Sequence, residues 1–142
     1  MKTSKKFFLF ISVLGLVAVL GILLNQFFSA SKTLAYGCFH QVAHKGSGCA
    51  ALVRKSDGQT ILQLIDFKTA ASNDLQILLI SAPDALENET VKNSERMVIA
   101  PLEKSEGFQE FVISEGQNPT NFHSVVIWNS KHGVNFTTAP LK

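Results

Sequence analysis

Apolar and polar positions divide this chain into two unlike parts. Residues 7–24 are apolar except for one serine and two glycines, and no charged residue occurs from Phe7 to Ser31. At about 1.5 Å per residue, a helix from Phe7 to Phe28 would be roughly 33 Å long, enough to cross a bilayer core. After residue 32, short apolar runs alternate with polar turns and helical periodicity is weak. The pattern therefore predicts a transmembrane helix followed by a domain of a different kind.

The pattern after residue 32 predicts an all-β domain. Its runs are rich in β-branched and aromatic residues and are separated by turn signals such as Ser56-Asp57-Gly58. Two runs, Leu75–Ile80 and Val125–Trp128, are almost entirely apolar and are expected to be central strands. The polar stretch 82–96 is expected to be a loop with one helical turn. The expected strands are 34–42, 49–55, 60–67, 75–81, 97–102, 108–113, 122–129 and 134–138. We therefore expect an antiparallel β-sandwich of about eight strands, preceded by the single N-terminal transmembrane helix.

The charges around the apolar segment predict its orientation. Lys2, Lys5 and Lys6 precede it and only Lys32 follows closely, so the positive-inside rule places the N-terminus in the cytoplasm and the domain outside. We divide the chain into residues 1–31, the cytoplasmic lysines plus the anchor, and residues 32–142, the exported domain. The alternative is a signal peptide that is cleaved to leave a secreted protein, because passable cleavage sites follow at residues 29–31 and 33–35.

The exported part carries little net charge. Residues 32–142 contain ten Lys and Arg against all eleven acids of the chain, a net charge of −1. This balance excludes binding to nucleic acid, which requires a basic surface. Locally, Lys45, Arg54 and Lys55 come before the first acid, Asp57. They are expected either to be solvated turn residues or to contact anionic lipid headgroups.

The two cysteines fall on the first two expected strands. Cys38 and Cys49 are equidistant from a turn near residues 43–45, which places them opposite each other in an antiparallel pair. In an exported domain this favours a structural disulfide. A redox-active pair and two free thiols stay as alternatives, although the spacing is not the Cys-x-x-Cys of thiol oxidoreductases.

The order of short motifs along the domain resembles the DM13 family, a small extracytoplasmic β-domain. The resemblance covers about Tyr36 to Leu141. It is carried by Gly37-x-Phe39, His44, Gly48-x-Ala50, Leu64-x-Asp66-Phe67, Asp74-Leu75-x-Ile77-x-Leu79, Pro101-Leu102, Gly107-x-Gln109-x-Phe111-x-Ile113, Ser124-Val125-Val126-Ile127-Trp128, Phe136 and Ala139-Pro140-Leu141. The short layout, one anchor and one domain, favours a bacterial-type member.

The resemblance implies a role in electron transfer, proposed because a cysteine usually follows the tryptophan of the last block. Here that position is Asn129, and Ser72-Asn73 replaces the expected Gly-Pro before Asp74. The fold and the extracytoplasmic location are therefore implied more strongly than redox chemistry.

Five residues are candidates for a ligand or cofactor site: His44, Asp66, Asp74, Trp128 and Asn129. The first three match the family pattern. A histidine could also sense pH, and a converging carboxylate pair could bind a hard cation or move protons. The alternatives are a hydrogen-bonded turn histidine and turn-capping acids. Trp128 is expected in the core or, if partly exposed, beside a flat ligand.

No reaction is specified by the sequence. There is no nucleophile motif, phosphate loop or zinc spacing among the four histidines and two cysteines, so no catalytic or metal-ligating residue is assigned. The cofactor is unknown, and haem or a metal is not excluded. We expect a membrane-tethered binding or accessory module rather than an enzyme, with the bilayer as one partner and its protein or small-molecule partner unknown. A redox domain and a structural envelope protein are the alternatives.

Overall fold

The computed structural model describes residues 15–21 and 31–142. Residues 15–21 are helical, and the rest of the predicted span Phe7–Phe28 lies outside the described residues. Within the described ranges no helix is both long and apolar enough to cross a membrane. The unit Ser31–Lys142 has its own dense internal contacts.

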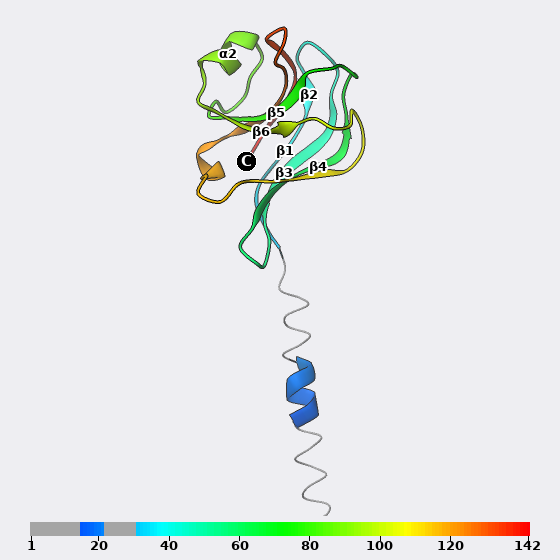
Figure 1. The fold of residues 1–142 in the computed structure, drawn as a ribbon, viewed down its shortest axis with the longest axis vertical. Coiled ribbons are helices and arrows are strands. Elements are labelled where there is room, and N and C mark those ends of the chain that lie inside the picture. Colours follow the sequence, from blue (N-terminus) through cyan, green and yellow to red (C-terminus); the bar gives the residue numbers. More distant parts are fainter. Residues whose placement is uncertain (1–14, 22–30) are drawn as a thin grey trace, which may run out of the picture. The chain divides into compact units, whose positions relative to one another are not determined.

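The unit consists of two antiparallel sheets (Figure 1). The first has the order β1 (Lys32–Cys38), β3 (Ser47–Arg54), β4 (Thr60–Lys68), β7 (Gln109–Val112). The second has the order β2 (His40–Gln41), β9 (Val134–Pro140), β8 (Ser124–Asn129), β5 (Leu75–Ile80), β6 (Arg96–Pro101). The helical elements after residue 31 are α2 (Asn88–Asn93) and the 3-10 turn Pro119–Asn121.

One hydrophobic core lies between the two sheets. It combines side chains from β3 and β4 with side chains from β5, β8 and β9. Phe39 and Phe67 meet edge to face within it, with ring centroids 5.2 Å apart. The buried side chains that carry the contact include Leu52, Leu62, Leu64, Ile77, Leu79, Val125, Ile127 and Phe136. Two antiparallel sheets around a shared core are the arrangement expected of a β-sandwich.

The strands β5 and β8 are interior strands of the second sheet, as the apolar runs predict. Their outer face is also covered, because Leu78, Ile80, Val126 and Trp128 form a second buried cluster with residues 82–91. The predicted helical turn in this loop is α2 (Figure 1). Its Val91 is fully buried in that cluster. Burial on both faces explains why these strands are continuously apolar instead of alternating.

The first expected strand, 34–42, is two strands in the structure. β1 pairs with β3 in the first sheet, and β2 pairs with β9 in the second, so the domain has nine strands where eight were expected. The change of sheet occurs at Phe39, whose side chain is buried in the core and whose N–H donates to Gly48 O at 2.9 Å. Burying this aromatic ring between the layers breaks a run that looks continuous in sequence.

The strand β1 is held on both of its edges. It pairs with β3 on one side, and on the other side the N–H of Tyr36 donates to Lys142 O and the N–H of Lys142 donates to Tyr36 O, each at 3.0 Å. A Cβ atom at Gly37 would overlap the carbonyl oxygen of Pro140. Only glycine lets the C-terminal segment pass this close to β1, so this position is fixed by backbone packing.

Replacing Gly37 with alanine is expected to destabilise the domain by at least about 3 kcal/mol, because the new methyl group meets backbone that cannot rotate away. Chemical denaturation of the purified chain measures the loss. Gly58→Ala is the matched control: Gly58 has φ +88° but open space around it, so we expect only about 1–2 kcal/mol from backbone strain. Equal losses in the two variants would contradict the packing role of Gly37.

Candidate functional site

Cys38 and Cys49 form a disulfide that joins β1 to β3, as the sequence predicts. The two residues are directly opposite each other in the strand register. They are separated by 11 positions, and closing a loop of that length contributes about 3 kcal/mol in the chain-entropy description. Cys38 is exposed and Cys49 is half-buried, so the bridge lies on the outer surface of the first sheet.

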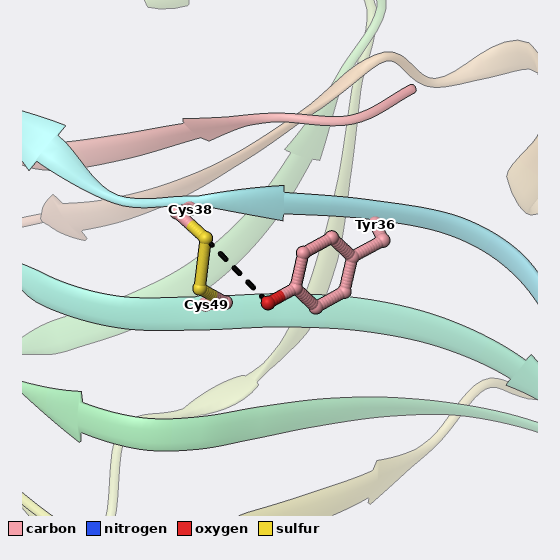
Figure 2. Close-up of a disulfide and its surroundings, with 3 residues drawn as sticks. All are labelled: Tyr36, Cys38 and Cys49. Atoms are coloured by element: carbon pink, nitrogen blue, oxygen red, sulfur yellow. Dashed lines mark hydrogen bonds between the residues drawn. A yellow bond between two sulfur atoms is a disulfide. The ribbon is translucent and has the colours of Figure 1, made fainter.

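Tyr36 lies beside this bridge (Figure 2). Its hydroxyl donates to Cys38 Sγ at 3.6 Å, and the residue is 48% exposed. The same face of the sheet carries a small apolar cluster of Ala51, Val53 and Ile61, with Ile65 packed against it. The disulfide is therefore accessible from solvent on one side and bordered by apolar side chains on the other.

Asp66 lies at an irregularity next to the disulfide. The register between β3 and β4 shifts between Ser47 and Cys49, and Asp66 has φ +48°. Gly48 faces it with φ +82°, and a Cβ atom there would be too close to the Asp66 backbone. Aspartate tolerates this left-handed conformation better than most residues, and the bulge directs the following Phe67 into the core. The left-handed backbone conformation at position 66 therefore explains the aspartate there.

Asp74 and Asn129 come together at one end of the second sheet. Asp74 has φ +62° and directly precedes Leu75, which pairs with Asn129. The Asp74 carbonyl accepts from the N–H and the hydroxyl of Ser130 at 3.0 and 3.1 Å. The Asn129 side chain accepts from the His132 N–H at 2.9 Å and donates to Ser72 Oγ at 3.4 Å. Both residues thus shape the loops around the β8–β9 turn.

Trp128 and His44 occupy different environments. Trp128 is 6% exposed and lies in the outer cluster beneath the segment that contains α2. His44 is exposed, and its ring centroid lies 4.0 Å from that of Phe136 on β9. No hydrogen bond or ion pair among the described residues joins His44, Asp66 and Asp74. In the described ranges, no three His, Cys, Asp or Glu residues are grouped so that they could hold a metal ion.

The sequence did not predict the pair His40–Asp84. His40 Nε2 lies 2.6 Å from Asp84 Oδ1, which also accepts from the Ala85 N–H at 2.8 Å. Burial alone would lower the pKa of His40, but the hydrogen bonds to Asp84 and the Gln41 carbonyl and the Asp84 charge raise it above its ordinary value. The partners are 44 residues apart, so no local spacing signals the contact. The pair links the loop before α2, which carries Asp84, to β2, which carries His40.

The domain is thus a two-sheet β-domain with a surface disulfide at its first strand. The family model described as "Electron transfer DM13" matches residues 38–141. The chain belongs to the DM13 family. Searches of curated proteins and of solved structures found no match.

The position of the usual family cysteine is buried in this chain, so introducing the cysteine should not yield a reactive thiol. Asn129 is 4% exposed and makes two side-chain hydrogen bonds. We expect Asn129→Cys to react slowly with a maleimide in the native state and to cost about 1–3 kcal/mol of stability, because His132 N–H loses its acceptor. Ser130→Cys, at the exposed neighbouring position, is the control and should label rapidly. Equally fast labelling of both would show that position 129 is accessible.

The His40–Asp84 pair is expected to make stability fall as the pH rises from the ordinary histidine pKa of about 6.5 through the raised pKa of His40. Because the pKa of His40 is raised in the folded state, the folded state holds its proton more tightly than the unfolded chain. The stabilisation from the His40–Asp84 pair is fully present below the ordinary pKa of histidine. It is lost as the pH rises through the raised pKa of His40. Melting temperatures across this range should fall more steeply for the wild type than for Asp84→Asn, which keeps the other histidines. Identical slopes would contradict the pairing.

Proposed function

We propose that this chain is a membrane-anchored, single-domain DM13 protein that acts outside the cytoplasm as a binding or accessory module. The anchor is Phe7–Phe28, the N-terminus is cytoplasmic, and residues 32–142 face the periplasm or cell surface. The observation that carries the location is the Cys38–Cys49 bridge, because disulfides persist mainly in oxidising, extracytoplasmic compartments. The three lysines before the apolar segment support the same orientation.

A hollow beside an edge strand supports a binding role. It has a volume of about 510 Å³ and is lined by residues 95–98 at the start of β6 and by Gln117, Asn118, Asn121 and Phe122. Its walls combine the apolar side chains of Met97, Val98 and Phe122 with the charged side chains of Glu95 and Arg96 and three amides. Ligand sites in proteins are of this size and commonly mix apolar walls with a few polar groups. A small molecule or an extended peptide is the class of ligand that fits.

Protease added to intact cells or spheroplasts should digest the domain while an N-terminal tag stays protected. The physical reason is the predicted topology, in which the bilayer shields only the part before Phe7. Immunoblots against tags at the two ends of the chain measure the outcome. A chain released into the medium without its N-terminal tag would instead support the cleaved signal peptide, and a protected domain would overturn the proposal.

Redox chemistry at the disulfide is the second candidate function. It is favoured by the exposure of Cys38 and by membership in a family described as acting in electron transfer. In such a step a dithiol partner would give two electrons and two protons, the Cys38–Cys49 bond would break to two thiols, and the partner would become a disulfide.

The two functions are separated by voltammetry of the full chain and of the Cys38→Ser/Cys49→Ser variant. An accessory module with a structural bridge should show no reversible wave at moderate potentials in either protein. A wave in the wild type that disappears in the double variant would favour the cysteine pair. An absorbance spectrum with a Soret band, or metal found by elemental analysis, would favour a bound cofactor instead.

A further inference from the structure

Three basic residues gather at the end of the domain where β1 begins. Lys32 is the first residue of β1 and is opposite Arg54, the last residue of β3. Lys55 follows directly in the turn to β4. Lys32 and Arg54 are exposed and Lys55 is half-buried. The turn between β3 and β4 lies beside the start of β1, at the end of the domain away from α2 (Figure 1).

These cations are not neutralised by acids of the domain. Among the described residues the ion pairs are His40–Asp84 and Lys92–Glu89, and neither involves the basic residues at this end. Two acids lie nearby. Asp57 in the same turn accepts from the Gln59 N–H at 2.9 Å. Glu115, which follows β7, lines a hollow together with Gly58, Gln59 and Thr60 beside the β3–β4 turn. Its strand is three strand spacings, roughly 14 Å, from β1. Three cations against these two acids leave the corner formed by β1 and β3 with a net positive charge.

The length of chain before β1 keeps this corner close to the bilayer. Lys32 follows Phe28 by four residues, which span at most about 14 Å when fully extended. The polar interface of a bilayer is itself roughly 5–8 Å thick on each side. Lys32 must therefore lie within about one Debye length of the headgroup surface, where charges are not fully screened. This step rests on the proposed function, because it requires Phe7–Phe28 to be in the membrane.

We propose that Lys32, Arg54 and Lys55 hold the β1–β3 corner against anionic lipid headgroups on the outer surface of the membrane. The contact sets the orientation of the domain on its tether, with the α2 end pointing away from the lipid. Lys45 is not part of this surface, although the sequence places it in the same basic stretch. It precedes β3, whereas Arg54 ends that strand, so the two lie at opposite ends of the sheet.

The test uses the full chain in vesicles of phosphatidylcholine, with or without phosphatidylglycerol, containing a headgroup-labelled energy acceptor. A donor dye is attached at Ser56→Cys in the β3–β4 turn or, as a second site, at Ala71→Cys beyond the far end of β4. Both positions are exposed.

The charge variant is K32Q/R54Q/K55Q. The matched control is K45Q/K68Q/K131Q, which removes the same charge from exposed residues; Lys45 precedes β3 and Lys68 is the last residue of β4, at the far end of the sheet, and Lys131 lies in the β8–β9 turn.

We expect energy transfer from position 56 to be higher in anionic than in neutral vesicles, and the difference to vanish in high salt. Each neutralised cation should lower the ratio of docked to undocked domain about fivefold, so the triple charge variant should lose the effect and the control should keep it. Position 71 should show little transfer. Equal transfer from position 56 in both vesicle types, or equal loss in both triple variants, would overturn the proposal. A chain that high salt washes from the vesicles would instead overturn the membrane anchor.

Discussion

The domain depends on the way its first strand is enclosed. β1 is paired with β3 along one edge and with the C-terminal residue along the other, and the Cys38–Cys49 bridge closes its end. Immediately afterwards the chain enters the core at Phe39 and continues in the other sheet. Bringing β1 and β3 together has a cost in closure entropy, and the covalent bridge lowers this cost because it restricts the unfolded chain.

This enclosure matters because β1 follows directly from the segment predicted to lie in the membrane. Any force on the tether acts first on Lys32, and it can detach the whole of β1 only by breaking pairs on both edges and the disulfide. The same bridge is also accessible for sulfur chemistry, since Cys38 is exposed beside Tyr36. A structural role and a redox role therefore compete at one site, and the proposed function assigns it the structural role.

The parts of the fold that were predictable from the sequence are those set by local patterns. The apolar runs of β5 and β8 indicated interior strands, and symmetry about one turn indicated the disulfide. The split of the first strand was not predictable, because Phe39 turns inward only in the presence of the second sheet. The left-handed backbone at Asp66 and Asp74 also depends on register shifts and loop contacts that no sequence spacing records.

The candidate site residues, like the fold, were predictable only as far as local sequence patterns identify them. Each motif residue is recognisable from its local sequence, but the structure distributes these residues over several places. Asp66 lies beside the disulfide, Asp74 lies near the buried Asn129 at the end of β8, and Trp128 lies beneath the α2 segment. The His40–Asp84 pair, by contrast, needs a contact across 44 residues.

The structural role of the bridge and the extracytoplasmic location both require the two cysteines to be oxidised in the cell. Free thiols would be alkylated in intact cells before lysis, and the full chain would be digested without reductant and analysed by mass spectrometry. We predict one peptide pair linked through Cys38 and Cys49, with neither cysteine alkylated. Alkylated Cys38 and Cys49 in most of the protein would contradict both the structural bridge and the extracytoplasmic location.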